Sequence, residues 1–442
     1  MFIIRRAGLA ALVFTALSGL VIVTEAIAQP TPAPLPDPAA TSVDALGWMQ
    51  GFPPAPDKLI TFDNPLGGAY PRNRWTFSHV RETVPTVNVW RGSGAASPLP
   101  TAPRDLDGIA FTALDGEPMT FGQMLPRTYT DGILVLHKGN VVYEKYFGAL
   151  TPERPHLAMS VTKSFVGTLA AMLVAEGKLD PVAPVVKYLP EMKDTAYGDA
   201  TVRQVMDMTI GVKYSENYAD PKAEVFDYAR AGGMLSQGSG YVGPKNFYAF
   251  LKTLQKDGDH GDAFAYKTVN AEVLAWILRR VSNQSLADLL SEKIWRRIGA
   301  EQDAYFMVDR IGTESGGGGL NTTLRDLARF GETMRNGGRA NGQQVIPASA
   351  VAEITGGGDK AKFAKAGYTL LPGWSYRDMW WVTNNDHGAY MARGIHGQSI
   401  YVDPKAEMVI VRYAAHPIAG NAGNDPLTLP AFHAVANALM AP

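Results

Sequence analysis

The apolar helical pattern over residues 160–176 is the feature that most limits how the chain can fold. Its large side chains recur at helical spacing, at Phe165, Leu169, Met172 and Leu173, and the residues between them are mostly Ala, Val and Gly. A helix that is apolar nearly all round is buried on every side. This segment therefore predicts a core helix around which the rest of a domain packs.

The predicted core helix begins at Ser160 and carries Lys163 one turn later. Residues three apart share a helix face, so Lys163 can reach the Ser160 hydroxyl. Burial lowers the pKa of a lysine, which can then take the proton that makes a serine nucleophilic. The helix N-terminus also favours developing negative charge. The pair indicates a serine nucleophile. The alternative, in which Ser160 only caps the helix, leaves a buried lysine without a partner.

Apolar, β-branched runs predict strands at both ends of the remaining chain. Residues 133–147 form a hairpin pattern around a Lys-Gly-Asn turn, and residues 399–413 form a second one around Asp-Pro-Lys-Ala. Residues 180–305 are mainly helical in pattern, and a last amphipathic helix is expected over 427–440. Early strands, central helices and late strands predict an α/β (α+β) sheet domain interrupted by a helical insertion.

The N-terminus has the three parts of an export signal. Arg5 and Arg6 supply the positive charge, residues 7–23 are apolar, and Ala28 ends a small-x-small cleavage site. The apolar stretch is short for an uncleaved membrane anchor, the alternative reading. The absence of cysteine fits an oxidising compartment. We expect cleavage after Ala28 and a periplasmic or secreted protein with no stable membrane span.

The mature chain divides into three predicted parts. Residues 29–104 begin with five alternating prolines and continue without clear periodicity, which predicts an N-terminal extension wrapped on the core. Residues 105–190 and 305–442 are expected to form the α/β domain, with 191–304 as the helical insertion.

Composition and missing motifs exclude several function classes. Basic and acidic side chains number 41 and 42 with no run of like charge, so there is no electrostatic footprint for nucleic acid. The eight histidines show no metal-ligand spacing, and a Gly-x-Ser-x-Gly nucleophile turn is missing. The glycine run at 316–319 lacks the lysine of a phosphate-binding loop and predicts a tight backbone passage. We therefore expect a small-molecule substrate, no metal and no cofactor.

Three further segments carry residue types found at hydrolytic sites: Tyr266-Lys267-Thr268-Val269-Asn270, Gly318-Gly319-Leu320-Asn321-Thr322-Thr323 and Gly394-Ile395-His396-Gly397-Gln398. Together with the Ser-x-x-Lys pair, they resemble the class C-like branch of the serine β-lactamase and penicillin-binding superfamily over about residues 105–440. The Tyr-x-x-x-Asn form, the 214–218 segment and the His-Gly-Gln triplet are most similar to the 6-aminohexanoate-dimer hydrolases and their esterase relatives. The resemblance implies a β-lactamase/transpeptidase-like antiparallel sheet flanked by helices.

The resemblance also implies catalytic roles. Ser160 would be the acylated nucleophile, and Lys163 either the base or the group that keeps Tyr266 deprotonated. Tyr266 would carry the proton to the leaving group. The backbone N–H groups of Ser160 and Ser399 would form the oxyanion hole.

Four residues are expected to contact substrate: Tyr218, Asn270, His396 and Gln398. Asn270 stands four residues after the tyrosine, where the superfamily usually has asparagine two residues after it, so it could instead cap the following helix. His396 takes the place of the usual lysine or histidine, and Gln398 that of a glycine. A neutral histidine is a weaker partner for a carboxylate, which counts against β-lactam hydrolysis.

The sequence thus predicts an exported serine hydrolase that cleaves a small amide, like those of 6-aminohexanoate oligomers, or an ester through a Ser160 acyl-enzyme. A carboxylesterase, a D,D-peptidase or β-lactamase-type enzyme, and a non-catalytic ligand-binding relative are the alternatives. The sequence does not specify an oligomeric state.

Overall fold

The computed structural model describes residues 34–61 and 70–441. The predicted export signal, its cleavage site after Ala28 and the first prolines of the extension lie outside the described residues. Pro36–Pro442 forms one compact unit. The predicted limits of the helical insertion, 191 and 304, stay a prediction.

A seven-stranded antiparallel sheet is the centre of this unit, with strand order β11-β12-β13-β14-β15-β4-β5. Its strands are β4 (Thr130–His137), β5 (Asn140–Tyr146), β11 (Ser375–Arg377), β12 (Trp380–Val382), β13 (Tyr390–Gly394), β14 (Gln398–Asp403) and β15 (Met408–Ala414). Both predicted hairpins are confirmed, as β4–β5 and β14–β15. Pairing of β15 with β4, for example Ile410 with Val135, joins the late strands to the early ones.

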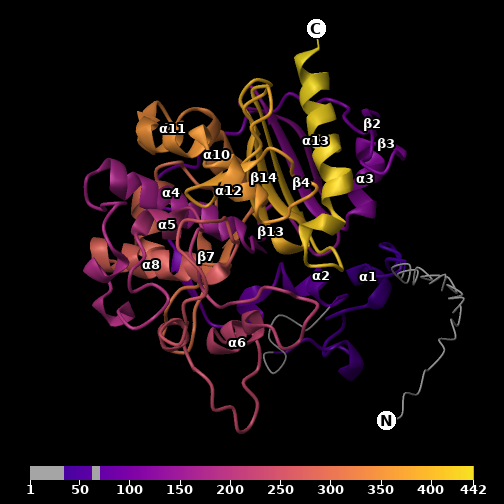
Figure 1. Cartoon of the computed structure of the whole chain (residues 1–442). Coiled ribbons are helices and arrows are strands. Elements are labelled where there is room, and N and C mark those ends of the chain that lie inside the picture. Colours follow the sequence, from indigo (N-terminus) through magenta and orange to yellow (C-terminus); the bar gives the residue numbers. More distant parts are fainter. Residues whose placement is uncertain (1–33, 62–69, 442) are drawn as a thin grey trace, which may run out of the picture. The chain divides into compact units, whose positions relative to one another are not determined.

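Helices cover both faces of the sheet, and α4 (Val161–Ala175), α8 (Thr268–Ser282), α10 (Leu324–Arg335) and α11 (Ala348–Gly356) lie on one side (Figure 1). On the other side lies α13 (Asp425–Met440), whose Phe432 ring packs 5.7 Å from the Tyr401 ring of β14. The predicted core helix is confirmed as α4, and the predicted last helix as α13. Gly331 lets α10 approach the sheet, because a Cβ there would lie 2.7 Å from Val409.

A second, four-stranded sheet has the order β1-β7-β8-β6. Its strands are β1 (Thr86–Val89), β6 (His156–Leu157), β7 (Ala304–Met307) and β8 (Leu320–Thr322). β1 comes from the N-terminal extension and pairs antiparallel with β7. β6 leads directly into α4, so this small sheet supports the start of the core helix. The extension is thus part of the fold around that helix.

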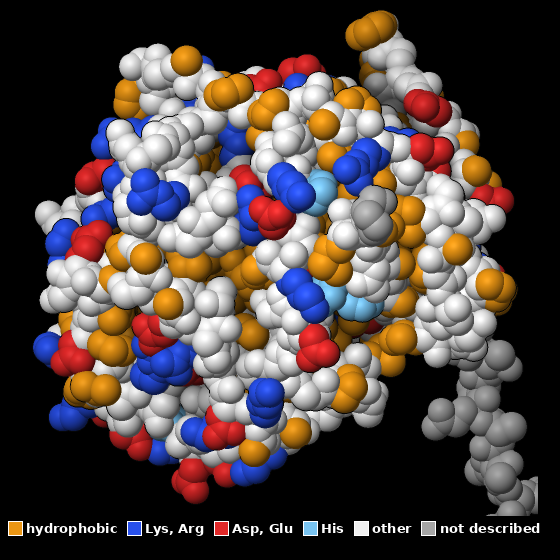
Figure 2. Space-filling model, turned by 90° about the horizontal axis from the view of Figure 1, so that it is seen from above, with side chains coloured by type: hydrophobic (Ala, Val, Ile, Leu, Met, Phe, Trp, Pro, Cys, Tyr) orange, Lys and Arg blue, Asp and Glu red, His pale blue; other side chains and the backbone are white. Residues whose placement is uncertain are grey.

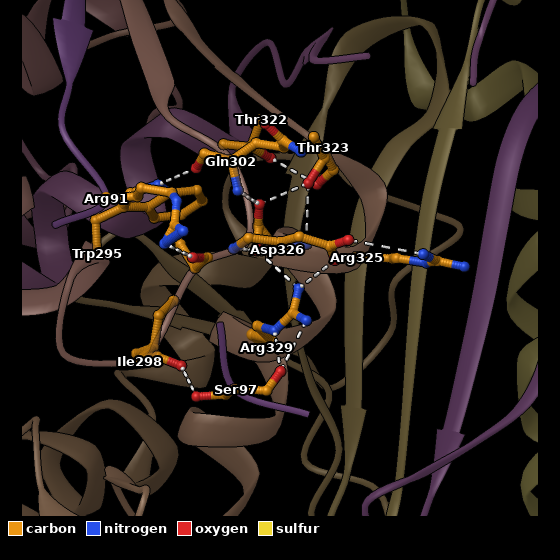
Figure 3. Close-up of polar contacts among 12 residues, drawn as sticks. Arg91, Ser97, Trp295, Ile298, Gln302, Thr322, Thr323, Arg325, Asp326 and Arg329 are labelled. Carbon is orange, nitrogen blue, oxygen red and sulfur yellow. Dashed lines mark hydrogen bonds and ion pairs between the residues drawn. The ribbon is translucent and has the colours of Figure 1, made fainter. Parts of the chain in front are cut away.

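A buried ion-pair network fixes the N-terminal end of α10 to the extension (Figure 3). Asp326 accepts hydrogen bonds from the Gln302 N–H at 3.0 Å and the Thr323 hydroxyl at 2.7 Å, and it pairs with Arg329 at 2.8 Å. Arg329 in turn donates to the Ser97 carbonyl at 2.8 Å. The buried Asp326 charge is thus paired and hydrogen-bonded. The network joins three parts of the chain that are distant in sequence, around Ser97, Gln302 and the start of α10.

The remaining elements are short: α1 (Val43–Leu46), α2 (Asn73–Thr76), β2 (Ala110–Thr112), β3 (Pro118–Thr120), α3 (Phe121–Arg127), α5 (Val202–Met206), α6 (Glu224–Ala231), α7 (Phe247–Leu251), α9 (Leu286–Leu290), β9 (Arg339–Ala340), β10 (Gln343–Gln344) and α12 (Lys360–Ala364). Within residues 34–61 and 70–441, every helix is too short or too polar to span a bilayer. On the face seen in Figure 2, basic and acidic side chains are interspersed.

Candidate active site

A sharp turn between β6 and α4 places Ser160 at the helix N-terminus. Met159, the residue before it, has a φ of +49°, in the left-handed region that costs a non-glycine residue energy. Ser160 itself is only 8% exposed, and its hydroxyl accepts from Lys163 rather than capping the helix. The Ser160 side chain therefore does not cap the helix. Its hydroxyl is bound by Lys163 instead.

Lys163 is 1% exposed and donates to two oxygens, the Ser160 Oγ at 2.8 Å and the Gly317 carbonyl at 2.5 Å. Burial lowers the pKa of Lys163 to about 8, and the charges of Glu216 and Glu272 oppose this shift. A substantial fraction of the amine is therefore neutral just above pH 7, which a general base requires.

Tyr266 lies two residues before α8 and completes the cluster. The Lys163 Nζ lies 5.2 Å from the centroid of its ring, which also packs 5.3 Å from the ring of Trp381. Burial raises the pKa of Tyr266 well above 10, the charge of Glu216 raises it further, and a hydrogen bond with Ser160 opposes both. The phenol is therefore protonated at neutral pH and can act as an acid. The structure brings the three predicted catalytic residues together.

Glu272, on α8, is a buried carboxylate that the sequence analysis missed. It accepts hydrogen bonds from Tyr228 at 2.6 Å, Ser315 at 3.0 Å, and the N–H groups of Gly316 at 3.0 Å and Gly317 at 2.9 Å. The carbonyl of Gly317 is the second acceptor of Lys163. Glu272 thus fixes the loop against which the lysine is held. A single glutamate within the otherwise largely apolar segment 269–278 was the available signal in the sequence.

The glycine run is the close backbone passage that its composition predicts. A Cβ on Gly317 would lie 2.4 Å from the Thr268 methyl group, and a Cβ on Gly316 would lie 2.5 Å from the Cβ of Ala275. Any side chain at these positions would push the loop away from α8. The Gly317 carbonyl, which accepts the hydrogen bond from Lys163, would move with the loop.

Two cavities meet at Ser160, and Tyr218 and Ile395 also line both of them. The first, which we call the apolar cavity, has a volume of about 370 Å³. Its walls include Phe77, Leu157, Val225, Ala229, Met234 and Met307. The second, which we call the charged cavity, has a volume of about 350 Å³. Its walls include Glu216, Tyr266, Tyr368, Trp381, Arg393 and Asp425.

The charged groups of the second cavity are each held in place. Glu216 accepts a 2.5 Å hydrogen bond from the Thr268 N–H, and burial raises its pKa while Lys163 opposes the shift. The Arg393 guanidinium donates to both Asp425 oxygens, at 2.5 and 2.7 Å, and lies 5.0 Å from the centroid of the Trp381 ring. Sequence reasoning missed Glu216 and Arg393 because their partners are distant in the chain.

The end of strand β13 lies against the Ser160 backbone. A Cβ on Gly394 would lie 3.0 Å from the Ser160 nitrogen, and Ile395 follows directly. The N–H groups of Ser160 and Ile395 are therefore the candidate oxyanion-hole donors. Ser399, expected in this role, lies within β14 opposite both Arg393 and Arg412 and outside both cavities, so the prediction for Ser399 is corrected.

Two of the four expected substrate contacts reach the cavities. Tyr218 lines both, and His396 lines the apolar one, where its Nδ1 donates to the His416 carbonyl at 2.6 Å. Burial lowers the pKa of His396, so its ring is neutral at pH 7.

Asn270 and Gln398 lie outside both cavities. The Asn270 carbonyl oxygen accepts from the Tyr197 hydroxyl at 2.8 Å. The Gln398 amide binds both backbone groups of Ala414, donating to the oxygen at 2.6 Å and accepting from the nitrogen at 3.0 Å. Both side chains therefore stabilise the fold, and the expectation of substrate contact is corrected. In the described parts of the chain, no group of three or more His, Asp or Glu side chains is arranged to hold a metal ion.

The chain is similar in sequence and fold to known proteins. Residues 127–427 match the Beta-lactamase family. A 6-aminohexanoate-dimer hydrolase of Paenarthrobacter ureafaciens is 38% identical over 348 residues, which cover 78% of this chain and 86% of that protein. The structure of a candidate 6-aminohexanoate-dimer hydrolase from Bacillus anthracis superposes with a TM-score of 0.80 at 31% identity, covering 87% of this chain and 98% of that one. EstCE1, a hydrolase with promiscuous acyltransferase activity, shares the fold at 17% identity and a TM-score of 0.54, over 70% of this chain and 93% of its own.

Proposed function

This chain belongs to the Beta-lactamase family as a serine hydrolase, and on that premise we propose that it cleaves a small amide or ester bond through an acyl-enzyme on Ser160. The observation that carries the proposal is the 2.8 Å hydrogen bond between the buried Lys163 amine and the Ser160 hydroxyl. A serine held by a base of lowered pKa is an activated nucleophile. We propose that the amide is an aliphatic one, like those that join 6-aminohexanoate units.

Neutral Lys163 takes the Ser160 proton as Oγ attacks the substrate carbonyl. The N–H groups of Ser160 and Ile395 stabilise the oxyanion that forms. Tyr266 then gives its proton to the leaving nitrogen or oxygen, and the Lys163 ammonium returns a proton to the phenolate. The products of this half-reaction are the acylated Ser160 and a neutral leaving group, with both side chains in their starting protonation states.

The pKa directions favour this order over its alternative. A lysine that kept Tyr266 deprotonated would need a phenol of lowered pKa, whereas burial raises the pKa of Tyr266 and lowers that of Lys163. In deacylation, water attacks the acyl carbonyl as neutral Lys163 takes one of its protons, and Tyr266 gives its proton to the Ser160 oxygen as that oxygen leaves. The acid is released, and the Lys163 ammonium returns a proton to the Tyr266 phenolate, so that both side chains are again in their starting states.

Labelling with a fluorophosphonate tests the nucleophile. We expect one adduct, mapped to the peptide that contains Ser160, and none in Ser160→Ala. A folded wild-type protein without an adduct, or with an adduct elsewhere, would contradict the proposal and favour a non-catalytic relative.

A D,D-peptidase is the second candidate, and Arg393 is the observation that favours it. A D-alanine leaving group carries a carboxylate, and Arg393 lines the cavity that contains the proton donor Tyr266. Release of D-alanine from acyl-D-Ala-D-Ala, measured beside hydrolysis of a simple aliphatic amide, separates the two candidates.

Export is a separate proposal, based on the N-terminal sequence. We expect the mature protein, isolated from the periplasm or the medium, to begin at Gln29. Recovery of the chain in the cytoplasm with its first residues intact would contradict it.

A further inference from the structure

The position of Tyr266 decides which cavity receives which half of the substrate, given the proposed function on which this inference rests. Ser160 lines both cavities, whereas Tyr266 lines the charged cavity and is not among the residues that line the apolar one. The leaving atom must be within reach of the Tyr266 hydroxyl when it takes its proton. The leaving group therefore occupies the charged cavity, and the acyl group extends into the apolar one.

The described walls of the apolar cavity offer no charge that could pair with a charged acyl group. Among the described residues that line it, none is Asp, Glu, Lys or Arg, and its one histidine, His396, is neutral at pH 7. The neighbouring carboxylate of Glu272 lies behind Tyr228 and Gly317 and is already bound by four donors. An ammonium or carboxylate in this cavity would be desolvated without a partner, which is costly.

The N-terminal extension contributes to the wall of the apolar cavity. Tyr70, Asn73 and Phe77 form one of its walls, and the Phe77 ring lies 5.3 Å from the His396 ring. Val225 and Ala229, which also line the cavity, come from α6. The cavity that takes the acyl group is thus built largely by segments outside the central sheet.

We propose that this enzyme selects an uncharged, apolar acyl group and discriminates against acyl groups with a terminal ammonium. The preferred substrates are amides or esters of plain aliphatic or aryl acids. The acyl half of an unblocked 6-aminohexanoate dimer carries a terminal amine, so that compound is a poor substrate here. This separates the enzyme from its relatives by substrate class while the chemistry at Ser160 stays the same.

The test compares 4-nitrophenyl hexanoate with 4-nitrophenyl 6-aminohexanoate, which differ only by the terminal ammonium at pH 7. We expect kcat/KM to be at least about tenfold higher for the hexanoate, because the ammonium loses its hydration in the cavity. Equal values, or a preference for the amino ester, would overturn the inference. This comparison uses the wild-type protein and depends on no substitution.

A matched pair of variants at Ala229 tests the cause. Ala229 has the smallest side chain among the described non-glycine residues of the cavity wall. A larger side chain at this position therefore replaces the fewest existing wall atoms. Ala229→Asp should raise the ratio of amino ester to hexanoate turnover at least about tenfold, whereas the neutral, isosteric Ala229→Asn should not. A shift of the ratio in both variants, or in neither, contradicts the charge argument, provided circular dichroism shows that both fold.

Binding to Ser160→Ala separates this inference from the proposed function. If neither ester is hydrolysed, the proposed function fails, but the cavity can still be probed with N-butylhexanamide and its 6-amino analogue by calorimetry. Tighter binding of the uncharged amide supports the inference in either case. Equal binding, or tighter binding of the amine, overturns it whether or not the protein is a hydrolase.

Discussion

The two cavities at Ser160 have nearly the same volume, about 370 and 350 Å³, and opposite chemistry. The apolar cavity is walled by Phe77, Met234 and Met307, whereas the charged cavity contains Glu216, Arg393 and Asp425. The proton donor Tyr266 lies on the charged side.

The difference shows where the protein places charge. Charged and titrating groups surround the side on which a proton moves and a polar leaving group forms. The apolar cavity is lined by uncharged side chains among the described residues, and in our proposal it holds the acyl chain, which does not change charge during the reaction. The side chains of the two cavities thus differ in the same way as the two halves of the proposed substrate on either side of the scissile bond. A substitution can therefore be directed at one cavity or at Ser160, which lines both.

Removal of the residue shared by both cavities should have the largest effect. We expect Ser160→Ala to lower kcat by about 10⁴-fold or more, with Lys163→Met nearly as severe and the double variant little worse, because the two act as a unit. Steady-state hydrolysis of an aliphatic amide measures this. Additive losses in the double variant would show that they act independently.

Tyr266→Phe should act on the charged side alone. We expect roughly a 10²- to 10⁴-fold loss for an amide, whose nitrogen must be protonated to leave, and a much smaller loss for a 4-nitrophenyl ester, whose phenolate leaves without a proton. The ratio of the two losses is the measurement. Equal losses for both substrates would remove Tyr266 from the role of acid.

The pH dependence should report the titration of Lys163. Only the neutral amine can accept the serine proton, and burial lowers the pKa of Lys163 to about 8. We expect kcat/KM to rise roughly 50-fold between pH 6 and pH 8, to about half of its maximum, and to level off above about pH 9. A rate that is constant over this range, or that falls as pH rises, would contradict the assignment of the base.

Glu272→Gln should shift that profile and lower the rate about tenfold, since it loosens the loop that holds Lys163. The negative charge of Glu272 raises the pKa of Lys163. Its removal should therefore move the ascending limb to lower pH, which a purely structural defect would not do. An unchanged midpoint would leave Glu272 with a role in stability only.

Phe77→Ala should act on the apolar side and have the smallest effect. We expect a three- to tenfold loss of kcat/KM for a hexanoyl ester and a smaller loss for the acetyl ester, whose chain is shorter. The matched truncation Leu371→Ala, in the wall of the charged cavity, should leave the ratio of the two esters as in wild type. A changed ratio in Leu371→Ala, or an unchanged one in Phe77→Ala, would contradict the placement of the acyl group.

Much of the fold was predictable because its signals are local. The hairpins over 133–147 and 399–413 and the core helix after Ser160 show as periodic patterns in adjacent residues. The Ser160–Lys163 pair is local for the same reason, since one helical turn fixes the relation between the two residues. Tyr266 could be added only through the family resemblance.

The rest of the site depends on contacts between distant residues. Glu272 and Gly316, 44 positions apart, meet only after α8 packs on the glycine loop. Ser399 was expected at the oxyanion hole from its position directly after the His-Gly-Gln triplet. Packing decides which backbone segment approaches Ser160, and it places Gly394 and Ile395 there instead. Asn270 and Gln398 are polar and adjacent to site residues, but their side chains face the interior of the fold.

Mass spectrometry of a quenched reaction tests the central claim most directly. Wild-type protein mixed with 4-nitrophenyl hexanoate and quenched in acid within the first turnover should gain the mass of one hexanoyl group, and peptide mapping should place that group on Ser160. Both the nucleophile and the assignment of the acyl half to the enzyme would then be established. Hydrolysis without a covalent adduct at any quench time, or a hexanoyl group on another residue, would contradict the account.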